Sequence, residues 1–215
     1  MLILGLALVF INPIQSIVIT YLSERLNTAE LNIEKVKKNE ASDANFEFDA
    51  VQSLSISEVL RAQASINSLP VIGSIVIPSV HMQLPILKGV GNGALAAGAG
   101  TMKPDQKLGQ GNYALAGHYF EGKDILFSPL YDAKMGDSVY LTDLQTIYEY
   151  KISSKEIIEA TDVFIIDDLP NKTILTLITC AENGQKRLAS QAEFVTQYSI
   201  HEAPPELSKS FKSLD

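Results

Sequence analysis

The chain has 215 residues, of which 46% are hydrophobic, and it carries a formal net charge of −8. This hydrophobic content is sufficient for a folded core and excludes an intrinsically disordered chain. The acidic balance gives no electrostatic footprint for nucleic acid, so we expect no nucleic-acid partner. One cysteine is present, Cys180, which excludes an intrachain disulfide and any multi-cysteine metal site.

The first segment is uncharged and apolar from residue 2 to residue 22. A helix needs roughly 20 such residues to cross a bilayer, and a proline such as Pro13 is tolerated inside membrane helices. We therefore predict a transmembrane anchor over residues 1–22, in a single-pass protein of the cell membrane whose larger part is extracellular. A cleaved signal peptide and a buried core helix are the competing interpretations, although the stretch has no basic start and no small-x-small cleavage site.

Beyond the anchor, the composition divides the chain into three parts. Residues 23–45 are polar and charged with a ragged helical period, which indicates a juxtamembrane linker. Residues 46–203 alternate short β-type runs with turn signals and form the predicted globular domain. Residues 204–215 form a polar tail that we expect to be poorly ordered.

The globular part reads as mainly β, with a few short helices. Helical patterns cover Ser55–Ser68, Gly93–Ala97 and Ser128–Asp132. About eight strands at short spacing predict a closed β-barrel or a sandwich. The predicted strands are Val71–Ile77, Met82–Leu87, Asn112–His118, Ser138–Thr142, Ile147–Ser153, Val163–Ile166, Thr173–Cys180 and Lys186–Val195.

Three residues at predicted strand ends have the chemistry of a cysteine enzyme. Alternation along the strand places Cys180 at its rim, on one face with Ile178, and places His118 similarly at the end of its own strand. Arg187 follows Cys180 by seven residues across a turn. A thiolate nucleophile, an acid/base and a cationic oxyanion donor make a catalytic set. Taken singly, a buried cysteine, a structural histidine and a solvated arginine are the commoner roles, and the pattern alone does not make the strands adjacent.

Two short motifs carry a resemblance to a known family. LAGH at Leu115–His118 and TLITC at Thr176–Cys180, with Arg187 soon after, resemble the signature of the sortases, which are bacterial cysteine transpeptidases. The resemblance extends from about residue 45 to residue 194 and also takes in IPSV at Ile77–Val80 and LFSPL at Leu126–Leu130. The N-terminal anchor fits it as well.

The resemblance implies an eight-stranded sortase β-barrel and a defined reaction. Cys180 would attack the Thr–Gly bond of an LPxTG-like sorting signal, Arg187 would stabilise the oxyanion, and His118 would move the proton. The thioacyl enzyme would pass the protein to an amine of a peptidoglycan precursor. Ala116, Ile178 and Thr179 match motif positions that line the sorting-signal groove or the oxyanion region. The resemblance thus implies three catalytic residues and three binding residues, which are His118, Cys180 and Arg187 and Ala116, Ile178 and Thr179.

Further features imply the class A, housekeeping type. The predicted anchor is N-terminal, no second hydrophobic run follows the domain, no aromatic Asp-Pro lid motif precedes it, and short loops at residues 167–172 and 181–186 leave no space for a long insertion. Some class A enzymes bind calcium through acidic residues before the AGH strand. Here residues 98–112 offer only Asp105, whereas calcium needs roughly six to eight oxygen ligands, so we expect no calcium and no other cofactor.

Three alternatives stay open from the sequence. One is a sortase of another type, such as a pilus polymerase. Another is a different cysteine hydrolase, although the papain-type C-G-x-C-W pattern is absent. The last is a wall-binding β-module in which Cys180 is inert and buried. The sequence does not define an oligomeric state, nor whether residues 46–68 cover the site.

Overall fold

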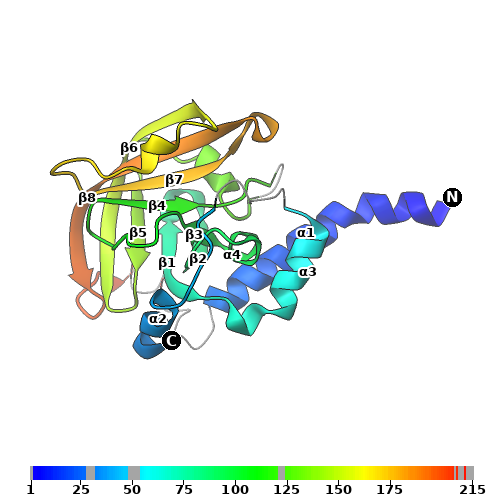
Figure 1. Ribbon diagram of the computed structural model, residues 1–215, viewed down its shortest axis with the longest axis horizontal. Helices are drawn as coiled ribbons and strands as arrows, with labels where there is room; N and C mark the ends of the chain where they lie inside the picture. The colour runs from blue at the N-terminus through cyan, green and yellow to red at the C-terminus, as the bar shows by residue number, and fades with distance from the viewer. Residues whose placement is uncertain are drawn as a thin grey trace.

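The computed structural model describes residues 2–27, 32–47, 54–120, 124–205, 207 and 211, and for residues 2–12 the backbone alone. Eight strands close into one barrel in the order β1-β2-β3-β4-β7-β8-β6-β5 (Figure 1). The strands are β1 Val71–Ile77, β2 Met82–Leu87, β3 Ala99–Thr101, β4 Asn112–Ala116, β5 Ser138–Thr142, β6 Thr146–Glu159, β7 Ile174–Ala181 and β8 Lys186–Ser199. The predicted mainly β, closed eight-stranded barrel is confirmed.

Two of the barrel pairings are parallel, β2 with β3 and β4 with β7. A parallel pair needs a long crossover, and the connection from β4 to β7 contains β5, β6 and two short 3-10 helices. These are η4, Ser128–Tyr131, and η5, Val163–Ile166. The crossover therefore places two strands side by side that lie about 60 residues apart in the sequence.

The helices pack along one side of the barrel (Figure 1). They are α1 Leu2–Asn27, α2 Ile33–Glu40, α3 Ile56–Ala64 and α4 Asn92–Ala97, and the remaining 3-10 turns are η2 Ile66–Ser68, η3 Pro78–Val80 and η6 Glu182–Gly184. Helix α3 begins at a capping box, in which Ser55 accepts from the Glu58 amide and the Glu58 carboxylate accepts from Ser55. It packs against α1 and α4.

The predicted strand at Val163–Ile166 was wrong, because this run forms the 3-10 turn η5. Its first two side chains, Val163 and Phe164, are 62% and 66% exposed, so only the end of the run is buried. A short apolar run does not distinguish a strand from a helical turn. The eighth strand is instead β3, whose small residues gave no strand signal.

The first helix contributes to the folded body. Ile19, Leu22 and Leu26 are buried in the main core, and the Ser23 hydroxyl donates to the carbonyl of Ala97 at 2.6 Å. The N-terminal turns of α1 extend away from the barrel (Figure 1). Among the residues whose side chains are described, we find no helix with the length and apolar character required to span a membrane.

Parts of the predicted linker and tail contact the barrel. Val36 of α2 is 3% exposed and Asn39 donates to the carbonyl of Val71, so the helix packs on the barrel wall. At the other terminus, Leu207 and Phe211 are buried against Val76 and other barrel residues. A few apolar residues within a polar segment are therefore sufficient to pack that segment against the domain.

Candidate active site

The parallel pairing of β4 and β7 brings the predicted residues together. Ala116 lies opposite Ile178, and the Gly117 amide donates to the carbonyl of Ile178 at 3.1 Å. The same register continued by two residues sets His118 beside Cys180. On the other side, Cys180 lies directly opposite Arg187 in the antiparallel pair of β7 with β8. All three residues therefore meet at one rim of the barrel, which the sequence alone did not establish.

Cys180 lies one residue before the end of β7, and it is a free cysteine with intermediate exposure. Alternation places its side chain on the outer face of the barrel, together with Ile178 and opposite to the inner residues Leu177 and Thr179. The thiol is therefore accessible at the rim, unlike a structural cysteine in the interior of a strand.

His118 is 8% exposed, and burial lowers the pKa of its imidazole to about 4. Desolvation disfavours the charged form, while the Glu58 carboxylate raises the pKa and offsets part of that effect. The main chain of His118 is fixed, because its carbonyl accepts from the Phe127 amide at 3.1 Å. The preceding Gly117 is required there, since a Cβ at this position would lie 2.5 Å from the Phe127 ring. The imidazole is thus neutral near pH 7.

Glu58 of α3 is a functional candidate that the sequence did not single out. Its side chain is 6% exposed; Oε2 accepts from the Ser55 amide at 2.9 Å, and Oε1 is buried without a hydrogen-bond partner. It is the charged group that acts on the His118 imidazole. The capping-box pattern S-x-x-E was visible in the sequence, but it indicated only the start of a helix.

Arg187 is the second residue of β8, and its side chain bonds back to the turn between β7 and β8. One guanidinium nitrogen donates to the carbonyl of Gly184 at 2.8 Å and to that of Lys186 at 2.9 Å. A guanidinium carries five N–H groups in a planar fork, so it has further donors for an oxyanion. Its place opposite Cys180 brings these donors to the level of the thiol.

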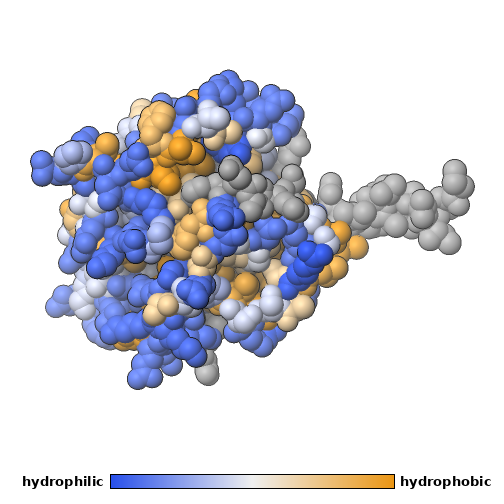
Figure 2. All heavy atoms as spheres, viewed as in Figure 1, coloured by the Kyte–Doolittle hydropathy of each residue, from blue (hydrophilic) through white to orange (hydrophobic). Residues whose placement is uncertain are grey.

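The three predicted binding residues separate onto two faces. Ala116 and Ile178 belong to an apolar layer on the outer face that also contains Ile166 and Ala189. Figure 2 shows an apolar surface area at the connection between β6 and β7, which Figure 1 locates. The 3-10 turn η5 lies in this connection and contributes exposed apolar side chains to the area. Thr179 is 2% exposed, and its hydroxyl donates to the Gly117 carbonyl at 2.8 Å. Its side chain therefore ties β4 to β7 instead of lining the outer face.

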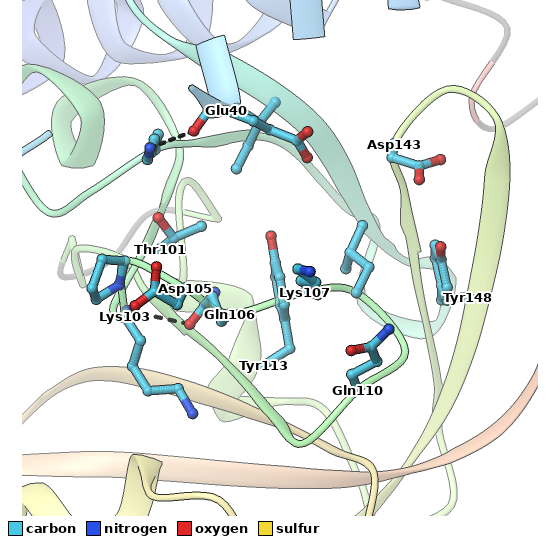
Figure 3. A pocket seen from close by; sticks show the side chains of 14 residues that line it. Glu40, Thr101, Lys103, Asp105, Gln106, Lys107, Gln110, Tyr113, Asp143 and Tyr148 are labelled. Carbon is cyan, nitrogen blue, oxygen red and sulfur yellow. Dashed lines mark hydrogen bonds between the residues drawn. The ribbon is translucent and has the colours of Figure 1, made fainter. Parts of the chain in front are cut away.

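A large polar hollow lies away from this rim, toward the start of β4. It has a volume of about 620 Å³ and lies between α2, the loop from β3 to β4, and the turn from β5 to β6. Figure 3 shows Glu40 and Asp143 on different sides of the hollow, with Tyr113 pointing between them. Among the described residues, no group of three or more His, Cys, Asp or Glu side chains is arranged to hold a metal ion.

The comparisons with known proteins agree with this geometry. The profile of the sortase domain family matches residues 75–195. The chain belongs to the sortase family. It is 40% identical to sortase A of Streptococcus agalactiae over 98% of this chain and 88% of that protein, and 40% identical to sortase A of Listeria monocytogenes over 83% and 80%. The crystal structure of the Listeria enzyme matches with a TM-score of 0.61 and 38% identity, over 66% of this chain and 96% of the other.

The predicted family is therefore confirmed, and the relatives support class A within it. The protein is an enzyme, a cysteine transpeptidase of the sortase type. This excludes the wall-binding module with an inert thiol that the sequence left open, as well as an unrelated cysteine hydrolase.

Proposed function

We propose that this sortase cleaves an LPxTG-like sorting signal between Thr and Gly and transfers the protein to an amine of a peptidoglycan precursor. The observation that carries the proposal is the meeting of Cys180, His118 and Arg187 at one rim through two strand pairings. The apolar layer of Ala116 and Ile178 leads along the outer face to the thiol, and it suits the apolar side chains of the signal.

The reaction starts from a thiol and a neutral imidazole. His118 takes the Cys180 proton, and the thiolate attacks the Thr carbonyl carbon. Arg187 donates to the oxyanion that develops on the carbonyl oxygen. The imidazolium then protonates the leaving Gly nitrogen, the C–N bond breaks, and a thioester remains. In the second half the amine attacks the thioester carbonyl carbon, and His118 takes a proton from the amine. The C–S bond breaks, and His118 passes that proton to the departing sulfur.

Glu58 supports this cycle without contact to the substrate. The imidazolium forms in a buried place, where an isolated charge is costly. The nearby Glu58 carboxylate counters that charge and is the group that raises the His118 pKa. It acts as a positioning residue behind His118.

The proposal includes attachment to the cell membrane and independence from calcium. The apolar sequence of residues 2–12 within α1, together with the projection of these turns from the barrel, supports membrane attachment with the catalytic barrel outside the cell. In the loop from β3 to β4, residues 102–111, Asp105 is the one acidic residue, too few ligands for calcium.

The test uses the full chain in detergent with an LPxTG peptide and a glycine amine. Wild type is expected to release the Gly fragment and form the ligated product, with or without EDTA. Cys180→Ala and His118→Ala are expected to lose both activities, and Lys151→Ala, which removes an exposed cation from β6, is the matched control. Cleavage without ligation assigns a hydrolase instead of a transpeptidase, loss of activity in EDTA overturns calcium independence, and a folded, inert wild type overturns the proposal.

A further inference from the structure

Two exposed tyrosine rings lie beside the reactive thiol, and the reaction described above does not use them. Tyr119 directly follows His118, and Tyr131 ends η4. Their ring centroids are 5.0 Å apart, with the planes inclined at 54°. They are 38% and 39% exposed, so both rings are accessible to a ligand from solvent.

Hydrogen bonds hold the Tyr131 ring and the two segments that carry the pair. The Tyr131 hydroxyl donates to the carbonyl of Cys180 at 3.0 Å. The Lys155 ammonium donates to the carbonyl of Tyr131 at 2.6 Å and ties η4 to β6. On the other side, the Phe120 amide donates to the Ser128 hydroxyl at 2.8 Å, which joins the segment after His118 to η4. The pair is therefore a built feature of the rim, held from two separate segments of the chain.

The electrostatic character of this place suits a cation. Aromatic faces attract ammonium groups, each with about 0.5–1 kcal/mol at exposed sites. Glu182, the first residue of η6, directly follows the end of β7 and adds a carboxylate to this end of the strand. Burial, the neighbouring Tyr119 and Cys180, and in smaller part Glu182 raise the pKa of the Tyr131 hydroxyl. The Glu182 carboxylate pairs with the Lys186 ammonium at 3.7 Å, and because both groups are largely solvated this pairing is weak.

The pair also lies on a different part of the rim from the sorting-signal layer. Ala116 and Ile178 precede the reactive residues along β4 and β7. Tyr119 follows His118, and Tyr131 and Glu182 lie at and beyond the end of β7. The second substrate of a transpeptidase must approach the thioester from a side that the first does not occupy. Near pH 7 that substrate, a primary amine, is mainly an ammonium ion.

We propose that Tyr119, Tyr131 and Glu182 form the acceptor subsite, which binds the incoming amine as an ammonium ion beside His118. The inference rests on the proposed transpeptidase function. The bound ammonium releases one proton to water, and the free amine attacks the thioester carbonyl carbon. The C–N bond forms as the C–S bond breaks, and His118 carries one amine proton to the departing Cys180 sulfur. One amide and one thiol result.

The test compares a charged with an uncharged acceptor in the full chain. The sorting peptide is held saturating, and KM is measured for triglycine, an ammonium at pH 7.5, and for hydroxylamine, which is uncharged there. Tyr119→Ala and Tyr131→Ala are each expected to raise the triglycine KM threefold to tenfold, and Glu182→Gln about twofold. The hydroxylamine KM in the same variants is expected to stay within twofold. Tyr198→Ala, in a tyrosine remote from the rim near the end of β8, is the matched control.

Two further measurements complete the test. One separates the role of the Tyr131 ring from that of its hydroxyl, and the other separates failure of the acceptor subsite from failure of the proposed transpeptidase function. Tyr131→Phe keeps the ring and loses only the bond to Cys180, so its triglycine KM is expected to stay near that of wild type. Equal shifts for both acceptors, or an unchanged triglycine KM in both alanine variants, overturn the acceptor subsite while thioester formation persists. A wild type that forms no thioacyl enzyme overturns the proposed function, and the subsite with it.

Discussion

The reactive rim and the polar hollow lie toward opposite ends of β4 and β7, and they use charge in different ways. The hollow has a volume of about 620 Å³ and both acidic and basic side chains in its wall. Two of its lysines are paired within the protein. The Lys88 ammonium donates to the carbonyls of Glu40 and Ser42, and Lys103 pairs with Asp168 at 2.6 Å.

At the rim, three groups lack a partner or have a shifted pKa. The Cys180 thiol is free, the His118 imidazole is buried with a pKa near 4, and one Glu58 oxygen has no partner. Reactivity depends on groups held in states that water would not favour. The volume of a hollow is therefore a poor guide to chemistry in this fold.

Replacing Arg187 is expected to have the largest effect on turnover. Arg187→Ala removes the oxyanion donor opposite Cys180, which is expected to lower kcat by about 10²–10³, and Arg187→Lys recovers only part because an ammonium lacks the planar fork. Single-turnover formation of the thioacyl enzyme measures the affected step. A loss of less than tenfold in the alanine variant contradicts the assigned role.

His118 is expected to make stability depend on pH. Its folded pKa is about 4, below the ordinary 6.5, so the unfolded chain binds a proton that the folded chain does not. The neutral His118 imidazole therefore makes its full contribution to the free energy of unfolding above pH 6.5. As the pH falls from 6.5 toward 4, the free energy of unfolding decreases by roughly 3 kcal/mol at most. The free energy of unfolding from urea titrations is therefore expected to fall more steeply for wild type than for His118→Gln between pH 7 and 4. Parallel curves contradict the buried neutral imidazole.

Glu58→Gln is expected to have a smaller effect on the same histidine. The amide keeps the helix cap at Ser55 but removes the charge that raises the His118 pKa. The acid limb of kcat/KM is expected to move to lower pH, and turnover at pH 7 to fall about threefold to tenfold because the imidazolium loses its counter-charge. Melting temperature is the control, and an unchanged acid limb removes Glu58 from the cycle.

The sequence identified the reactive residues better than it identified their surroundings. LAGH, TLITC and the following Arg187 are short motifs that report chemistry directly. Glu58 and Tyr131 lie in segments that give no such pattern, and they reach the rim only through helix packing and the β4-to-β7 crossover. Such contacts between distant segments are set by tertiary structure, which local periodicity does not encode.

The fold was predicted in kind and in number of strands, but one predicted strand is a 3-10 turn and one strand was missed. Two of the three residues of β3 are Ala and Gly, which are depleted in strands, whereas the apolar run of η5 is rich in strand-forming residues. The N-terminal helix shows a second limit. Leu22 and Leu26 are apolar in sequence, and only the structure identifies the barrel as their partner. The apolar residues of a helix indicate that one of its faces is buried, but they do not indicate whether that face is buried against protein or in lipid.

The polar hollow is expected to give the smallest effect on catalysis. Burial and the nearby Asp143 raise the Glu40 pKa, and Lys88 lowers it, so Asp143→Asn relieves a repulsion within the wall. Turnover in Asp143→Asn and Glu40→Gln is expected to stay within twofold of wild type at saturating peptide, because neither group faces the rim. The free energy of unfolding is expected to change by less than about 1 kcal/mol. A tenfold loss of turnover in either variant, with unchanged melting temperature, breaks the comparison, because it requires coupling between the two ends of the barrel.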